Sequence, residues 1–251
     1  MLRPAGDRAE PDDVVRRSLV GRLALGGLAA TAVAIPFTLL ALLVLGKWEP
    51  LAQLDSDVAN DLNGVSRTHG GVVAVLDFLA VAFDPWVFRL VVLAVVVWLF
   101  RRDARRLATW AALTVVVGGV LSVLLKRLVE RARPAFDDPV AHANGYSFPS
   151  GHALNSFLCT GVLILVFLPV LRRAARVLVY LIGTAVVLLT GFDRVALGVH
   201  YVSDVVAGWI VALGCLVGTA GAFEIWRREH GLRPSGPSEG VEPEAAPELR
   251  G

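Results

Sequence analysis

Two cationic side chains, Lys126 and Arg133, stand seven residues apart in the stretch KRLVERARP. An arginine offers a planar fork of donors and a lysine offers a mobile point charge, so the pair could bind an oxyanion such as phosphate. Because Pro134 disfavours helix at the residue before it, we expect the chain to turn away from a preceding helix at Arg133. The alternative is an exposed basic helix end without a ligand.

The stretch YSFPSGHALNS places a serine, a glycine and a histidine where an apolar run begins. Ser150 is predicted to be the N-cap of a helix that starts near Gly151. The unpaired N–H groups and the positive dipole end of such a helix bind phosphate, and His152 in the first turn would point at the same anion. A capped helix start with an incidental histidine is the alternative.

The stretch DRVALGVHYVSD holds a histidine and an aspartate four residues apart, His200 and Asp204. This spacing predicts that both lie on one face of a helix. A carboxylate that accepts from one ring nitrogen fixes the tautomer and leaves the other nitrogen free for nucleophilic attack. Arg194, six residues before the histidine, is expected in a loop or at a helix end. A satisfied His–Asp pair at the boundary of a membrane span is the alternative.

The elements that must position these residues are membrane helices. Of the 251 residues, 55% are hydrophobic, and they gather in five runs without a charged side chain and a sixth interrupted by Arg89. A bilayer core requires about 20 apolar helical residues, so we predict an all-α, polytopic membrane helix bundle with about six transmembrane helices. The runs are 23–46, 85–100, 107–125, 153–171, 177–192 and 205–223.

The basic residues indicate how this bundle is oriented. Six spans place both termini on one side, and that side receives sixteen of the 24 lysines and arginines. The bias predicts a plasma-membrane protein with cytoplasmic termini and with the three stretches on the extracytoplasmic side. We expect residues 1–20 and 229–251 to be disordered cytoplasmic segments, and 21–228 to form the six-span domain. The run 23–46 is interpreted as a retained anchor.

Other segments have simpler interpretations. Apolar residues recur at three- or four-residue spacing from Leu51 to Val65, which predicts an amphipathic helix on the outer interface, with a plain connector as the alternative. Cys159 and Cys215 fall inside predicted spans, so neither a disulfide nor a cysteine metal site is expected. The net charge is only +2, and no nucleic-acid partner is expected.

Together, the three stretches resemble the signature motifs of the type-2 phosphatidic acid phosphatase superfamily in order, spacing and membrane context. The matching residues are Lys126-x6-Arg133-Pro134, Pro149-Ser150-Gly151-His152 and Arg194-x5-His200-x3-Asp204. The resemblance implies a membrane-bound phosphatase that acts on a lipid phosphate without a metal ion or other cofactor.

The resemblance also implies which residues bind phosphate. These are Lys126, Arg133 and Arg194, with help from Ser150 and the backbone of Gly151. Their positive groups would stabilise charge on the phosphate oxygens.

One position departs from the family pattern. The family usually has serine before the arginine of the third motif, and this chain has Asp193. The carboxylate would either repel phosphate or hold Arg194 in place.

The catalytic roles implied by the resemblance fall on three residues. His200 would attack phosphorus and form a phosphohistidine, Asp204 would orient His200, and His152 would protonate the leaving group and later activate water. The partners are then the bilayer and a lipid phosphate such as phosphatidate, phosphatidylglycerol phosphate or polyprenyl diphosphate. The alternatives are a non-catalytic lipid-binding or transport protein of the same fold, and a vanadium-dependent haloperoxidase, which shares the anion-binding residues.

Overall fold

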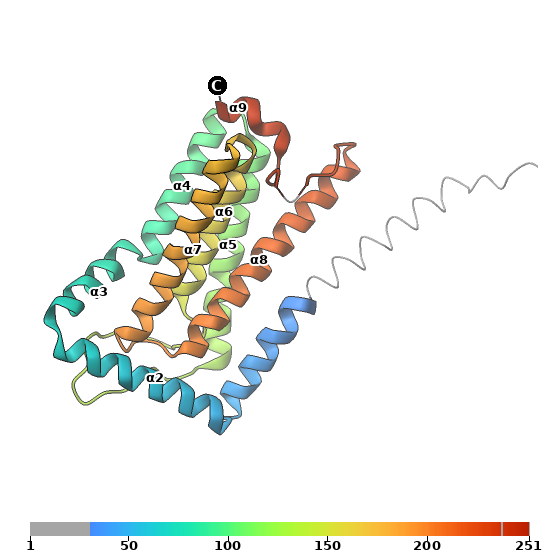
Figure 1. Cartoon of the computed structure of the whole chain (residues 1–251). Helices are drawn as coiled ribbons and strands as arrows, with labels where there is room; N and C mark the ends of the chain where they lie inside the picture. Colours follow the sequence, from blue (N-terminus) through green and yellow to red (C-terminus); the bar gives the residue numbers. More distant parts are fainter. Residues whose placement is uncertain (1–30, 237, 251) are drawn as a thin grey trace, which may run out of the picture.

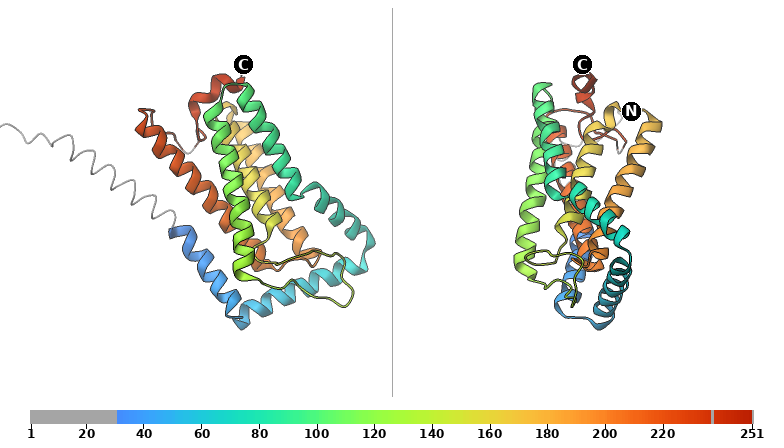
Figure 2. Two further views of the ribbon diagram at one scale, coloured as in Figure 1. Left: turned by 180° about the vertical axis from the view of Figure 1, so that it is seen from behind. Right: turned by 90° about the vertical axis from the view of Figure 1, so that its left-hand side faces the viewer.

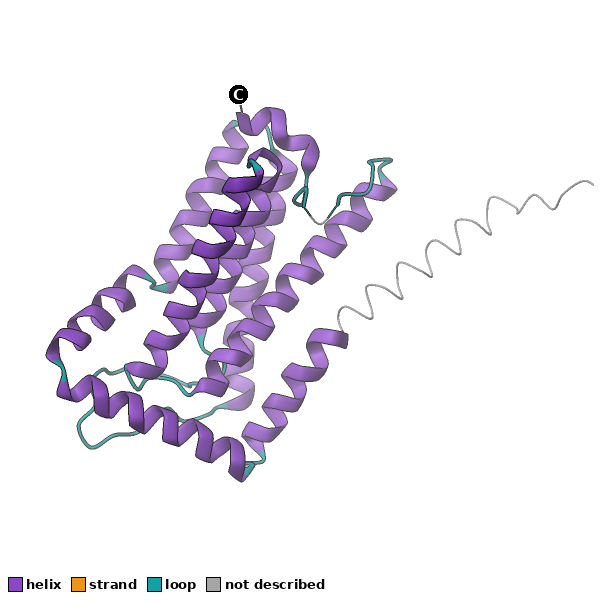
Figure 3. Ribbon diagram, in the orientation of Figure 1, coloured by secondary structure: helices purple, strands orange, loops and turns teal. Residues whose placement is uncertain are grey.

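The computed structural model describes residues 31–236 and 238–250, and every regular element in these ranges is a helix (Figure 3). A helix over Thr31–Leu45 comes first. It is followed by α2 (Glu49–Thr68), α3 (Gly70–Ala82), α4 (Pro85–Arg101), α5 (Arg105–Val129), α6 (Gly151–Phe167), α7 (Arg173–Ala196), α8 (Val202–Glu229) and α9 (Ala246–Arg250), with 3-10 turns at Leu168–Val170 and Pro243–Ala245. The predicted N-terminal segment 1–20 and the first part of the run 23–46 lie outside the described residues.

The long helices satisfy the length and hydropathy that a membrane span requires. Five stretches do so alone, and a sixth is added if the bent pair Thr31–Leu45 and Glu49–Thr68 is one span. The five stretches are Gly70–Arg101, Arg105–Val129, Gly151–Val170, Arg173–Ala196 and Val202–Glu229. The predicted all-α membrane bundle is therefore confirmed.

The span around the predicted run 85–100 is longer than expected, because α3 and α4 together form the 32-residue stretch Gly70–Arg101. Asp84 starts α4, and its Oδ1 accepts from the N–H of Trp86 at 2.8 Å. Arg89, which interrupts the apolar run, donates from Nε to Oδ1 of Asn155 on α6 at 3.0 Å. The charged group within the bundle thus has a polar partner, as the low dielectric requires.

α6 is the central helix and packs against α4, α5, α7 and α8. Its side chains Leu154, Leu158, Val162 and Val166 are fully buried in the main apolar core. Their spacing of four residues places them along one stripe of the helix. The second stretch of candidate residues therefore lies at the start of the best-packed helix of the bundle.

α6 and α8 approach closely near their first turns. A Cβ at Gly208 would lie 2.7 Å from the backbone oxygen of Ser150, so only glycine fits there. The N–H of Ser150 donates to the C=O of Asp204 at 2.9 Å. The starts of these two helices are thus joined through the backbone.

α2 crosses the lower end of the bundle in Figure 1, bent by 84° from the helix before it, and both views of Figure 2 show it there. The helix predicted for this segment is present. Its buried residues, however, are Asp55, Ala59, Asn63 and Ser66 rather than the apolar stripe. Ser66 Oγ donates to the C=O of Ala196 at 3.1 Å, so polar groups attach α2 to the end of α7.

The C-terminal segment differs from the predicted disordered tail. Val241, Ala245 and Leu249 are buried in the main core cluster, at the end of the bundle opposite α2 (Figure 1). Arg227 is fully buried and forms ion pairs with Glu224 at 2.7 Å and Glu244 at 2.6 Å. A few apolar residues at four-residue spacing and one buried ion pair therefore order a segment whose composition suggested disorder.

Candidate active site

The three stretches meet at the end of the bundle that α2 crosses, where α5 and α7 end and α6 and α8 begin (Figure 1). Lys126 lies in the last turn of α5, Arg133 in the loop after it, Ser150, Gly151 and His152 at the start of α6, Arg194 in the last turn of α7, His200 in the α7–α8 loop, and Asp204 in the first turn of α8.

The first stretch leaves its helix before the arginine, as Pro134 predicted. α5 ends at Val129, and Glu130 adopts a left-handed conformation with φ of 49°. Lys126 Nζ donates to the C=O of Tyr146 at 2.6 Å, and Arg133 Nη2 reaches the same oxygen at 3.4 Å. The ammonium and the guanidinium therefore converge, although they no longer share a helix.

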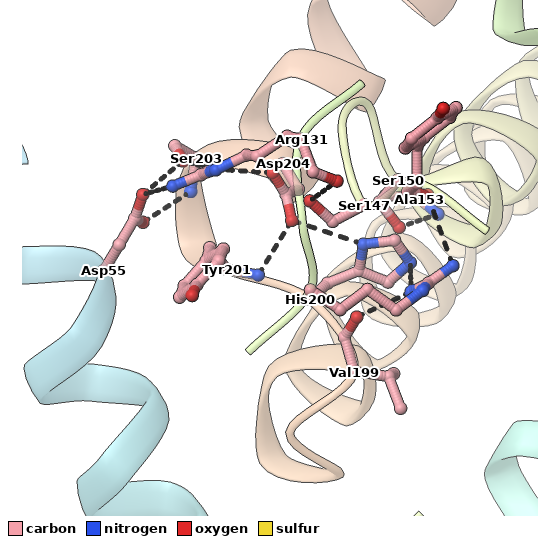
Figure 4. Close-up of polar contacts among 12 residues, drawn as sticks. Asp55, Arg131, Ser147, Ser150, Ala153, Val199, His200, Tyr201, Ser203 and Asp204 are labelled. Carbon is pink, nitrogen blue, oxygen red and sulfur yellow. Dashed lines mark hydrogen bonds and ion pairs between the residues drawn. The ribbon is translucent and has the colours of Figure 1, made fainter. Parts of the chain in front are cut away.

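The second stretch is attached to the other two through its backbone. Ser150 is the N-cap of α6, as predicted, and its Oγ accepts from the N–H of Ala153 at 3.4 Å. The N–H of Ser147 donates to the C=O of Arg131 at 2.9 Å. Together with the Ser150–Asp204 contact, this bond holds the start of α6 between the first and third stretches (Figure 4).

The third stretch corrects one prediction. His200 and Asp204 are in contact, but they do not share a helical face, because α8 begins only at Val202. Asp204 Oδ2 instead caps the helix by accepting from the N–H of Tyr201 at 2.9 Å, and the same oxygen lies 3.4 Å from Nδ1 of His200 (Figure 4). The pair therefore combines a helix cap with an imidazole–carboxylate contact.

The surroundings of His200 favour its neutral form. The ring is 2% exposed, and its Nε2 lies 3.1 Å from Nη1 of Arg133, which can only donate. Nδ1 therefore carries the proton toward Asp204, and Nε2 presents a lone pair. Burial, together with the charges of Arg133 and Lys126, lowers the pKa of His200 to about 4, against the raising effect of Asp204.

A second imidazole lies near these cations. Nε2 of His152 is 3.2 Å from Nη1 of Arg194 and 3.9 Å from Oδ2 of Asp84. Burial lowers the pKa of Arg133, Asp204 opposes this, and the positive charge of Arg194 adds to the lowering.

Asp193 contacts Arg194 directly. Its Oδ2 accepts from Nε at 2.9 Å and also from Nη2 of the arginine. The Asp193 side chain is fully buried, and its partner is 8% exposed. The aspartate that replaces the usual serine therefore holds the arginine, and Nη1 remains directed at His152.

Two residues with direct contacts to the site were not among the predicted ones. Arg131 Nη1 donates to Asp204 Oδ1 at 2.6 Å, and Nη2 donates to Asp55 Oδ2 at 2.8 Å (Figure 4). Arg131 sits only two residues before Arg133, in a basic cluster on the side with few basic residues, which was a usable signal. Asp55 lies 76 positions before Arg131, and its position on α2 carries no sequence signal.

The arrangement offers positive charge around a neutral imidazole. Among the described residues, neither Lys126 nor Arg133 forms an ion pair with a carboxylate; their hydrogen bonds go to backbone oxygens and to His200. Such donors are available to an incoming oxyanion, whose charge they would stabilise beside the buried imidazole. Chemically, the site can bind a tetrahedral oxyanion beside a nucleophilic nitrogen.

Comparison with known proteins agrees with this geometry. Residues 107–228, which contain all three stretches, match the sequence model of the PAP2 superfamily. Residues 107–228 form a PAP2 superfamily region. The chain is 40% identical over 98 residues to phosphatidylglycerophosphatase B of Bacillus subtilis (strain 168). This alignment covers 38% of this chain and 47% of the relative. The chain is also 27% identical over 168 residues to undecaprenyl-diphosphatase BcrC of the same organism. That alignment covers 64% of this chain and 79% of the relative.

The fold of this protein is shared with a solved structure. The crystal structure of a transmembrane PAP2-type phosphatidylglycerolphosphate phosphatase from Bacillus subtilis superposes with a TM-score of 0.68 at 24% identity, covering 80% of this chain and 98% of the other. The match to the first curated relative spans about half of that relative's length. The fold comparison supports an integral membrane protein.

Proposed function

We propose that this protein hydrolyses the phosphate monoester or diphosphate of a membrane lipid through a phosphohistidine at His200, on the extracytoplasmic side. The observation that carries the proposal is the position of the His200 Nε2 lone pair, 3.1 Å from Arg133. A phosphate that replaces this contact would bring its phosphorus to the nucleophile while Arg133 binds its oxygens.

In the first step, Nε2 of His200 attacks phosphorus, and the bond between phosphorus and the lipid oxygen breaks. Asp204 stabilises the positive charge that develops on the ring. A phosphate that draws Arg194 away frees Nε2 of His152 to take the proton of the bound lipid phosphate's own P–OH group, and His152 then passes this proton to the leaving oxygen. The lipid departs as an alcohol, or as a lipid monophosphate if the substrate is a diphosphate.

In the second step, water attacks the phosphohistidine. His152, now neutral, takes a proton from that water, and the phosphorus–nitrogen bond returns its electron pair to Nε2 of His200. Inorganic phosphate takes that proton from His152 as it leaves, and both histidines return to their starting neutral forms. The positive charges come from side chains, so we propose that no metal ion is needed.

An apolar cavity that runs along α8, from near the site toward the opposite end of the bundle, supports a lipid substrate. It measures about 790 Å³ and lies between the helix Thr31–Leu45, α5 and α8, with Phe37, Leu125 and Val211 among its lining residues. The Phe37 ring lies 5.9 Å from that of Phe148, two residues before Ser150. An acyl or prenyl chain could therefore lie in the cavity while its phosphate lies beside Lys126 and Arg133. The named activities of the relatives, on phosphatidylglycerophosphate and undecaprenyl diphosphate, fall within this class.

The test is phosphate release in detergent, with EDTA present. The panel contains short-chain phosphatidate, phosphatidylglycerol phosphate and a prenyl diphosphate, compared by kcat/KM. We expect the wild type to release phosphate and His200→Ala to lose at least about 1000-fold in kcat, as removal of a nucleophile does.

The matched control is His230→Ala, since His230 is exposed at the opposite end of α8. It should retain wild-type activity. A folded wild type that releases no phosphate from any of the lipids would support a non-catalytic lipid-binding or transport protein instead. Activity that disappears in EDTA and returns with a divalent cation would contradict metal independence.

A further inference from the structure

Arg131 lies at the centre of a buried ionic network, and the catalytic proposal assigns Arg131 no role. Its guanidinium contacts Asp204 at 2.6 Å, Ser203 Oγ at 2.7 Å and Asp55 at 2.8 Å. The side chain is 16% exposed, while those of Asp55 and Asp204 are 1% and 0% exposed. The guanidinium also lies over the ring of Tyr201, 4.2 Å from its centre.

Asp55 closes the network from α2. Its Oδ1 accepts from the N–H of Ser203 at 3.0 Å, and its Oδ2 accepts from the Ser203 hydroxyl as well as from Arg131. Asp55 thus binds the first turn of α8 and the loop after α5 simultaneously (Figure 4). A helix that crosses the end of the bundle is tied to the two segments that form the site.

The two oxygens of Asp204 have separate partners. Oδ1 contacts Arg131, and Oδ2 accepts from the N–H of Tyr201 and faces Nδ1 of His200. With Oδ1 occupied, the carboxylate cannot rotate without losing a charge-assisted bond. Its second oxygen is therefore kept in the direction of the imidazole.

We propose that Arg131 is a positioning residue that fixes Asp204 for His200, and that Asp55 acts through Arg131 to couple α2 to the site. This inference rests on the proposed hydrolysis. Arg131 differs from Arg133, because its donors are already bound to carboxylates and a hydroxyl, whereas those of Arg133 face backbone oxygens and the imidazole. Arg131 should therefore influence turnover rather than phosphate binding.

The test separates kcat from KM in Arg131→Met, Asp55→Asn and the double variant. We expect kcat to fall about 10- to 100-fold in Arg131→Met, because residues that orient a catalytic side chain through hydrogen bonds typically contribute this much. KM and the inhibition constant of orthovanadate should stay unchanged. Asp55→Asn should lower kcat less. The double variant should be no slower than Arg131→Met alone, because both changes break one linkage.

Matched controls are Arg127→Met, at an exposed residue in the last turn of α5, and Asp57→Asn, at an exposed residue of α2. Both should keep the wild-type kcat. If Arg131→Met does not fold, Arg131→Lys supplies the test: an ammonium cannot serve both carboxylates as a guanidinium does, so kcat should fall by a smaller factor.

Each other outcome overturns the inference. An Arg131 variant with wild-type kcat removes the positioning role, and one with a weaker vanadate inhibition at unchanged kcat makes Arg131 a phosphate ligand. Effects of Arg131 and Asp55 that multiply would show that Asp55 acts by another route. Failure of the proposed function itself is distinguishable, because then the folded wild type releases no phosphate at all.

Discussion

His200 combines two properties that a nucleophilic imidazole requires. Its ring is buried without a positive charge, and its two nitrogens face different partners, a carboxylate at Nδ1 and a cation at Nε2. The contact with Asp204 is long at 3.4 Å, as catalytic contacts often are before substrate binds. Binding of phosphate would displace Arg133 from Nε2 and make the lone pair available.

The first prediction concerns the charge of this ring. Burial lowers the pKa of His200 to about 4, so the folded protein should keep this ring neutral at pH 5.5. Nitrogen-15 NMR of histidine-labelled protein measures this, with His200→Gln to assign the signal. A His200 ring that titrates between pH 6 and 7 would contradict the burial argument.

The same pKa has a consequence for stability. As pH falls below about 6.5, the unfolded chain takes up a proton on this histidine, but the folded chain does so only near pH 4. The contribution of His200 to the free energy of unfolding is therefore present above pH 6.5 and is lost as pH falls toward 4.

At the residue scale, sequence patterns located groups with local signals and missed those that depend on tertiary pairing. Proline after an arginine and serine before an apolar run both predicted backbone geometry correctly, at Arg133 and Ser150. Asp55 is buried only because Arg131 and Ser203 reach it from distant segments. Its neighbours in sequence contain no trace of these partners.

At the scale of elements, the close approach of α6 and α8 determines where the site forms. The main chain of Ser150 touches both Asp204 and the position of Gly208. The hydrogen-bonded starts of the two helices place the imidazole of α6, His152, beside the loop that carries His200. A displacement between these helices would therefore change the site directly.

The second prediction follows from that contact. Gly208→Ala places a Cβ 2.7 Å from the Ser150 oxygen, so the helices must shift, and we expect a loss of about 1–3 kcal/mol in stability together with a lower kcat. Gly71→Ala, in α3 with open space around its Cβ, is the control and should be neutral. Thermal unfolding and phosphate release measure the two effects. Equal behaviour of the two variants would refute the role of the close approach.

At the scale of the whole molecule, the site and the C-terminal segment occupy opposite ends of the bundle (Figure 1). Hydropathy located the spans because each contains a long stretch of high mean hydropathy with few charged residues. Composition suggested disorder for the C-terminal segment because its apolar residues Val241, Ala245 and Leu249 are few, and they become buried only when the segment packs on the folded bundle. Composition indicates disorder only where no such surface is available.

The third prediction concerns orientation. The basic-residue bias predicts that the site end faces away from the cytoplasm. A cysteine at Asn144, which is exposed in the loop before α6, should react with an impermeant thiol reagent in intact cells, and one at Arg172 should react only after lysis. The native Cys159 and Cys215 are buried and give little background. The reverse pattern would place the site on the cytoplasmic side.

The most direct test of a covalent step at His200 is the stereochemistry at phosphorus. A lipid thiophosphate made chiral with oxygen-16 and oxygen-18 is hydrolysed by the wild type in oxygen-17 water, and the configuration of the released thiophosphate is determined. Attack by His200 followed by attack by water inverts phosphorus twice, so we predict net retention. Net inversion would mean that water attacks the lipid phosphate directly and that His200 never carries the phosphoryl group.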